Sequence, residues 1–161
     1  MFAIFYNING PVLQVAVPKG KSITGTFYKE KVLKKLKARI AKRRPGRGIK
    51  YMSLFHDNAP AQKSAIVVDF LKQEKVRVLP HAPYSPDLAP CDFFLFPRLK
   101  KHLSGKHFAS RQALGSAVYQ CMLGIPPSDY EKSFKRWIKR LKRCIECGGE
   151  YFEGMKRKQK Q

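Results

Sequence analysis

Acidic residues are scarce in this chain. Asp and Glu together number 11 among 161 residues, against 33 Lys and Arg, and the formal net charge is +22. Ahead of residue 57 there is no Asp and only one Glu, Glu30. A charge this large exceeds what solubility requires, so the sequence predicts a polyanionic partner, either a nucleic acid or an anionic membrane surface.

Long apolar runs are also absent. No run approaches the ~18 residues that cross a bilayer, and the N-terminal segment lacks the basic and apolar parts of a secretion signal. We therefore expect a soluble, unsecreted protein with no membrane span, which favours nucleic acid over a membrane as the partner.

Cysteines are too few for a disulfide scaffold in a chain of this length. The four are Cys91, Cys121, Cys144 and Cys147. The last two form a Cys-x-x-Cys pair, but no second pair of ligands with zinc-site spacing accompanies it. We interpret all four as reduced thiols.

The order of apolar patterns alternates between strand and helix, which predicts a mixed α/β sheet covered by helices. Two β-rich runs around Asn9-Gly10 predict a hairpin. A basic helix is expected next, ended by a Pro-Gly-Arg-Gly turn. The expected strands are 2–6, 12–17, 49–55 and 76–79, and the expected helices are 26–44, 64–75, 91–102 and 132–143.

The last of these helices carries a single apolar stripe on an otherwise cationic surface. Phe134, Trp137, Ile138 and Leu141 follow the i, i+3, i+4, i+7 spacing. Such a helix packs by its stripe and presents charge to solvent or phosphate. We expect a main domain over residues 1–125 and a basic helix and tail over residues 126–161.

Two aspartates beside prolines are the candidate catalytic residues. Asp57 lies in His-Asp-Asn-Ala-Pro, Asp92 follows Ser-Pro-Asp-Leu-Ala-Pro-Cys, and 34 residues separate them. They are isolated negative charges in a positive field. Two such carboxylates can bind a hard divalent cation, while the cationic surround can hold a nucleic-acid backbone.

Three longer motifs resemble the catalytic domain of mariner-type transposases. They are His-Asp-Asn-Ala-Pro-Ala at 56–61, Tyr-Ser-Pro-Asp-Leu-Ala-Pro-Cys-Asp-Phe-Phe-Leu-Phe-Pro at 84–97 and Leu-Lys-Lys-His-Leu-Ser-Gly-Lys-His-Phe at 99–108. The resemblance covers essentially the whole chain. It extends to 134–152, which looks like the C-terminal helix of that family.

The resemblance implies a ribonuclease-H-like fold, in which three acids at strand ends hold Mg²⁺ or Mn²⁺ for attack on a DNA phosphodiester. By family position, Asp57 and Asp92 are the second and third catalytic aspartates and metal ligands. DNA is then the partner and the nucleus the compartment.

The first acid of that family lies on a strand preceding 2–6, and these residues do not encode it. We expect an N-terminally truncated fold that binds metal weakly or not at all and does not cleave or join DNA alone. The strand edges left without a partner would favour self-association.

The polar residues around the pair have ordinary interpretations. Asp87 in Ser-Pro-Asp-Leu is expected to cap a turn rather than to bind metal. His56 and His81 are more simply packed or hydrogen-bonded residues than ligands. Gln62 stands where the family often has His, so a titrating group is lost there.

A non-catalytic, sequence-nonspecific nucleic-acid-binding protein is the alternative function, with DNA or RNA as ligand. Residues 29–50 hold eleven Lys or Arg against one acid, so neighbouring turns repel unless a polyanion is bound. A basic structural protein, such as a ribosomal one, would explain the charge but not the two aspartate motifs. The expected phosphate contacts are Lys34, Lys35, Arg39, Arg43, Arg44, Lys135, Arg136, Lys139, Arg140 and Arg143.

Overall fold

The predicted hairpin opens the fold. In this computed structural model, which describes residues 1–20 and 22–149, β1 (Phe2–Asn7) pairs antiparallel with β2 (Gly10–Ala16). Gly10 has φ +109°, a value that side chains other than glycine rarely tolerate. A register shift between Phe5 and Tyr6 marks a β-bulge.

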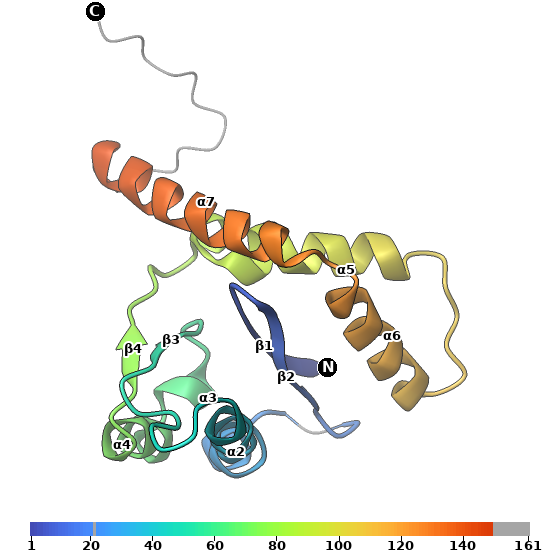
Figure 1. Ribbon diagram of the computed structural model, residues 1–161, viewed down its shortest axis with the longest axis horizontal. Coiled ribbons are helices and arrows are strands. Elements are labelled where there is room, and N and C mark those ends of the chain that lie inside the picture. Colours follow the sequence, from blue (N-terminus) through green and yellow to red (C-terminus); the bar gives the residue numbers. More distant parts are fainter. Residues whose placement is uncertain (21, 150–161) are drawn as a thin grey trace, which may run out of the picture.

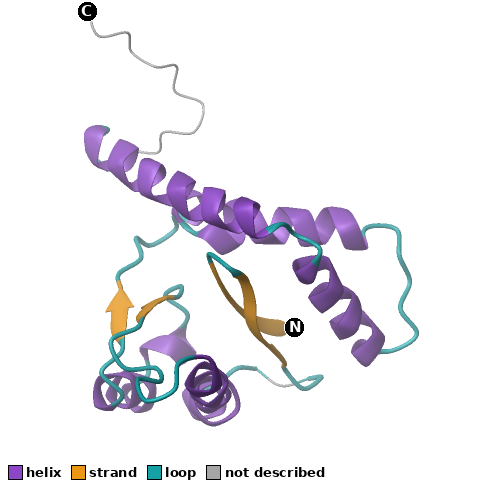
Figure 2. Cartoon of the chain, viewed as in Figure 1, coloured by secondary structure: helices purple, strands orange, loops and turns teal. Residues whose placement is uncertain are grey.

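Alternation along β1 places its side chains in two different hydrophobic cores. Ala3 and Phe5 pack against the first core, whereas Phe2, Ile4 and Tyr6 pack against the second. The hairpin is therefore covered on both faces, as Figures 1 and 2 show.

The basic helix predicted over 26–44 is confirmed, with a π-helical turn inside it. Thr24 caps its start by accepting a hydrogen bond from the Phe27 amide at 3.2 Å. Val32, Leu36 and Ile40 recur every four residues and are buried against the first core. Its three parts are α1 (Gly25–Phe27), η1 (Tyr28–Leu33) and α2 (Lys34–Arg43).

A parallel strand pair with two short helices completes the first half. β3 (Ser53–Phe55) pairs with β4 (Arg77–Leu79), and α3 (Pro60–Lys63) and α4 (Ala65–Gln73) connect them. The strand predicted over 49–55 is wrong at its start: a turn runs to Tyr51. Gly48 and Tyr51 have φ +55° and +59°, which interrupt an extended strand.

The expected single sheet is divided in two. The described strands form two separate pairs, β1–β2 and β3–β4. Both pairs contribute to the first core, which contains Val12 and Val15 from β2 and Leu54 from β3. The two pairs stay separate because no strand among the described residues lies between β1 and β3 and pairs with both.

The second half is helical, and one of its helices, α6 (Arg111–Leu123), was not predicted from the sequence. α6 carries Arg111, Gln112, Ser116 and Gln120 among its apolar residues, so no clear stripe marks it, and Gly115 interrupts it. The helices of the second half are η2 (Pro86–Leu88), the π-helical η3 (Cys91–Leu95), α5 (Phe96–Leu103), α6 (Arg111–Leu123) and α7 (Pro127–Glu146).

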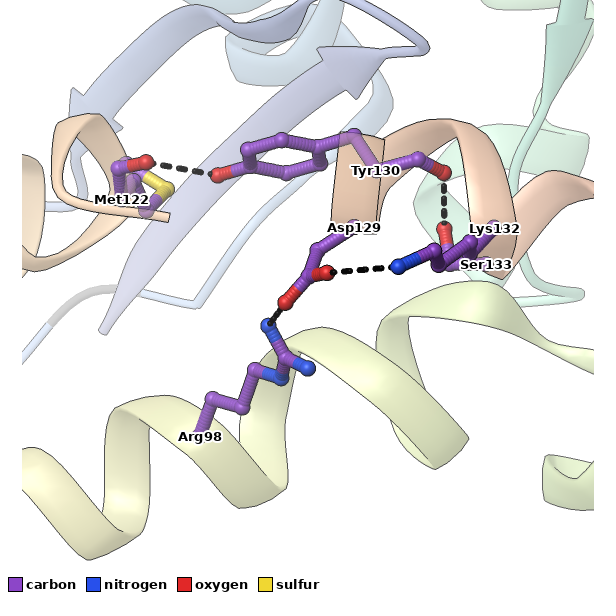
Figure 3. Close-up of polar contacts among 6 residues, drawn as sticks. All are labelled: Arg98, Met122, Asp129, Tyr130, Lys132 and Ser133. Atoms are coloured by element: carbon purple, nitrogen blue, oxygen red, sulfur yellow. Dashed lines mark hydrogen bonds and ion pairs between the residues drawn. The ribbon is translucent and has the colours of Figure 1, made fainter. Parts of the chain in front are cut away.

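The start of α7 is fixed to α5 and α6 by the contacts in Figure 3. The fully buried Tyr130 donates from its hydroxyl to the Met122 carbonyl at 2.8 Å, and Ser133 donates to the Tyr130 carbonyl at 2.7 Å. Arg98 of α5 forms an ion pair with Asp129 at 2.9 Å. α7 is therefore anchored at its N-terminal end, and from there it continues as a long helix past the strand pairs (Figure 1).

Two expectations concern the chain as a whole: that it has no membrane span and that it divides near residue 125. The described helices include none with the length and apolar character that crossing a bilayer requires. The expected division at residue 125 falls in the connection between α6 and α7 and stays a prediction. The tail of the second expected unit, residues 150–161, lies outside the described residues.

Candidate metal-binding site

Asp57 stands two residues beyond the C-terminal end of β3. The Ala59 amide donates to Asp57 Oδ1 at 3.1 Å, which orients the carboxylate in an Asx turn. Pro60 then starts α3 at its first position, where its missing N–H costs nothing. The side chain is exposed, so a ligand can reach its second oxygen.

Asp92 is the second residue of η3, the π-helical turn that leads into α5. Its amide donates to the Ala89 carbonyl at 2.9 Å, and its side chain is exposed. π-Helical turns are rare and often occur at functional sites, because the inserted residue changes which side chains share a face.

The two aspartates interact electrostatically. Partial desolvation raises the pKa of Asp92, the negative charge of Asp57 raises it further, and His81 and Lys100 oppose the shift. The same two carboxylates act on the neighbouring Cys91. Burial is the main cause that raises the pKa of its thiol to about 12, and the charges of Asp92 and Asp57 add to the shift. Cys91 is therefore a protonated thiol beside the carboxylate pair.

The two histidines are packed and hydrogen-bonded, as predicted. His56 Nδ1 lies 3.4 Å from the Tyr28 hydroxyl, and burial lowers the pKa of His56 despite the opposing charge of Asp57. The His81 ring stacks edge-on against Phe55 with centroids 5.1 Å apart, and its carbonyl accepts from Asn58 Nδ2 at 2.9 Å. These contacts join the ends of β3 and β4.

Asp57 and Asp92 offer the carboxylate oxygens that a hard divalent cation prefers. In the part of the chain that the structure describes, no three His, Cys, Asp or Glu side chains cluster as metal ligands. Mg²⁺ is often bound through one or two carboxylates with water completing its shell, so Asp57 and Asp92 suit a single weakly held ion. A cation between them would also relieve the repulsion that raises the pKa of Asp92.

Asp87 lies outside this pair. It is buried, with 7% of its surface exposed, and its backbone carbonyl accepts a hydrogen bond from Arg140 at 3.0 Å. The interpretation of Asp87 as a structural residue rather than a third ligand is consistent with this position. The capping role of its side chain stays a prediction.

Gln62 faces a cavity of about 430 Å³ that Asp57 also lines. Its side-chain oxygen is buried and has no hydrogen-bond partner among the described residues. Because a glutamine amide does not titrate in the physiological range, this position supplies a hydrogen-bond acceptor rather than a proton carrier.

α7 lies across the ends of both strand pairs. Its Trp137 packs on Phe55 of β3 with ring centroids 4.6 Å apart, and its Phe134 packs on Tyr6 of β1 at 5.8 Å. The apolar stripe predicted on this helix is thus confirmed in part as a packing surface, although Ile138 and Leu141 are exposed. Sequence reasoning missed the contact across the two sheets, since no local pattern encodes it.

Nine of the ten predicted phosphate-contacting residues lie on α2 and α7, and Arg44 directly follows α2. Their surroundings differ. Lys34 and Lys135 form ion pairs within their own helices, at 2.6 and 2.7 Å from Glu30 and Glu131. Arg140 stacks over Phe93 at 4.5 Å in addition to its bond to Asp87. Seven of the ten are exposed, namely Lys34, Lys35, Arg39, Arg43, Lys135, Arg136 and Lys139.

Removing the charge of Asp92 should stabilise the fold. The pKa of Asp92 is raised in the folded state, which means that folding disfavours the ionised carboxylate. The folded protein therefore loses stability as the pH rises through the usual aspartate range and Asp92 ionises. Asp92→Asn should increase the free energy of unfolding at pH 7 by less than about 1 kcal/mol, because the group is largely exposed.

Urea denaturation across pH measures this effect. The gain should vanish in acid, where Asp92 is protonated in both states. Asp69→Asn on α4 removes another exposed carboxylate with the same change in net charge and serves as the control. An Asp92→Asn protein that is no more stable than this control at pH 7 would contradict the assignment.

The α/β fold, with helices around its two strand pairs, is ribonuclease-H-like, as the similarity to the solved Mos1 catalytic domain shows. Within that class, the chain is similar in sequence and in fold to the catalytic domain of mariner-type transposases. No model of a known protein family matches the chain.

Two curated relatives carry the sequence similarity. The human histone-lysine N-methyltransferase SETMAR is 28% identical over 159 residues, and the Mariner Mos1 transposase of Drosophila mauritiana is 26% identical over 154 residues. Each match covers 95% of this chain, but only 22% of SETMAR and 45% of the Mos1 transposase. The chain thus spans less than half the length of either relative.

Solved structures carry the similarity in fold. The Mos1 catalytic domain with raltegravir and Mg matches with a TM-score of 0.86 and 25% identity, over 94% of this chain and 76% of that one. The same domain has been solved with Mn. The Mos1 paired-end complex with the left transposon end matches with a TM-score of 0.85 and 26% identity, over 94% and 44% of the two chains.

Proposed function

We propose that this chain is a transposase-derived DNA-binding protein that retains two of three catalytic carboxylates and does not cleave DNA by itself. The observation that carries the proposal is the electrostatically coupled pair of Asp57 and Asp92, in a part of the fold where no third acid joins them. The similarity to the Mos1 catalytic domain supports the ancestry.

Asp57 and Asp92 would hold a single Mg²⁺ or Mn²⁺, and the Mos1 structures with these ions support the choice of metal. A bound ion would neutralise the carboxylates and polarise a phosphate oxygen. The chain itself orients Asp57 through the Ala59 amide and keeps the Cys91 thiol protonated beside the pair. Two carboxylates cannot fix the pair of ions that in-line phosphodiester cleavage uses in this superfamily.

DNA is the proposed ligand, because α2 and α7 both expose cations and the Mos1 relatives include complexes with transposon ends. RNA, the other ligand named for the binding alternative, has no support among these relatives. A nuclear location and self-association follow from the same proposal, the latter because the Mos1 paired-end complexes and the unpaired strand edges both favour it.

Charge reversal on the two basic helices tests DNA binding. The double variant Lys35→Glu/Lys139→Glu should bind a short duplex about tenfold more weakly, since two phosphate contacts become repulsive. Fluorescence anisotropy measures the affinity at fixed salt. Lys19→Glu/Lys101→Glu changes the net charge equally at exposed sites on a loop and on α5, and it should bind nearly as the unchanged chain does. If both double variants lost the same affinity for the duplex, DNA binding would depend on net charge alone and not on α2 and α7.

A further inference from the structure

The edge of β2 that faces away from β1 borders a groove that Phe2 of β1 also lines. Among the described strands, β2 pairs with β1 alone. A groove of about 540 Å³ is lined by Val12, Leu13, Gln14 and Ala16 of this strand. Because successive strand residues point to opposite faces, a groove lined by consecutive residues runs along the edge of the strand.

The two walls of the groove come from opposite faces of the hairpin. Arg39 of α2 lines one wall, and Arg111 and Tyr119 of α6 line the other. Gln14 Nε2 donates to the Gly115 carbonyl at 2.9 Å, which ties α6 to β2. A Cβ at Gly115 would lie 3.2 Å from the Phe2 ring, so glycine permits this close approach.

The groove offers unmet hydrogen-bonding capacity as well as charge. Gln14 Oε1 is buried and has no partner among the described residues. An edge strand also presents its own outward N–H and C=O groups. Arg39 is exposed, and Arg111, which also lines the groove, donates to the Met1 carbonyl at 3.2 Å.

We propose that this groove binds an extended acidic peptide segment of a partner protein, which adds to β2 as a further strand. Peptide N–H and C=O groups would pair with the exposed backbone of the strand edge, while acidic side chains would meet Arg39 and Arg111. A DNA backbone offers only acceptors, so it fits this groove less well than the open basic faces of α2 and α7. The site is independent of Asp57 and Asp92.

A labelled synthetic peptide of about eight residues, in which Glu alternates with Val, tests the proposal on the full chain. Anisotropy should report saturable binding, and amide resonances of Val12 to Ala16 should shift in heteronuclear NMR spectra. Arg39→Glu should weaken binding about fivefold or more, whereas Lys35→Glu, equally exposed on the same helix but outside the groove, should leave it nearly unchanged.

A second peptide separates strand pairing from charge attraction. Methylation of alternate amide nitrogens along one edge keeps every charge but removes the donors, so this peptide should lose binding. Equal binding of the two peptides would overturn the proposal. It would also be overturned if a single-stranded oligonucleotide displaced the peptide and its own binding depended on Arg39 but not on Lys35, because the groove would then be a nucleic-acid site.

Discussion

Supercoiled plasmid incubated with the purified chain and Mg²⁺ or Mn²⁺ is expected to stay intact. Phosphodiester cleavage by two metal ions needs the entering and the leaving oxygen to be stabilised together, with the ions about 3.5 to 4 Å apart. Asp57 and Asp92 supply two carboxylates, and the described residues add no third ligand to them. One weakly held ion cannot stabilise both oxygens.

Gel electrophoresis of the plasmid forms measures the result against a commercial nicking enzyme as positive control. Any trace of nicking should persist unchanged in Asp57→Asn, which marks it as contamination. Metal-dependent nicking that disappears in both Asp57→Asn and Asp92→Asn would show that the pair suffices for cleavage, and the proposed inactivity would be wrong.

Affinity for duplex DNA is expected to fall about a thousandfold when salt rises from about 50 to about 200 mM, as for proteins that neutralise about six phosphates. The reason is counterion release: each phosphate neutralised by an exposed Lys or Arg frees bound cations, and added salt opposes that release. α2 and α7 together expose seven of the predicted contact residues, which makes six contacts attainable.

The slope of log affinity against log salt concentration measures how many phosphates the protein neutralises. Lys35→Glu/Lys139→Glu should reduce that slope by about two, and scrambling the duplex sequence should change affinity little. A slope near zero would exclude an interface built on phosphate contacts. A strong dependence on sequence would instead require base contacts that these lysines do not make.

Much of the fold could be predicted because its local signals agree with its packing. Asn9-Gly10 between two β-rich runs predicted the hairpin, and the basic helix predicted over 26–44 ends at Arg43, just before the Pro-Gly-Arg-Gly turn. The π-helical turns are a different matter. The apolar periodicity of the sequence does not distinguish η1 and η3 from ordinary α-helix.

The errors also have physical causes. Residues 49–55 have strand composition, but positive φ at Gly48 and Tyr51 confines the strand to its last three residues. α6 was missed because its polar residues are spread around the helix and Gly115 lowers its helical propensity, while contact with Phe2 and Gln14 stabilises it. Tertiary contacts decide such elements.

For the site, sequence and structure contribute different parts. The motif spacing singled out Asp57 and Asp92, and the structure adds that each raises the pKa of the neighbouring Cys91 and that Asp57 raises that of Asp92. The Tyr28 contact with His56 and the groove beside β2 join residues far apart in the chain, so no local pattern could have indicated them.

Mn²⁺ binding is the most direct test of the claim that Asp57 and Asp92 form one weak divalent-ion site. Titration followed by electron paramagnetic resonance should show one ion bound with a dissociation constant of about 0.1 to 1 mM, typical of sites with few ligands. Asp57→Asn and Asp92→Asn should each weaken binding about tenfold or more, and Asp69→Asn should leave it unchanged. No saturable binding, or binding that both variants retain, would contradict the account.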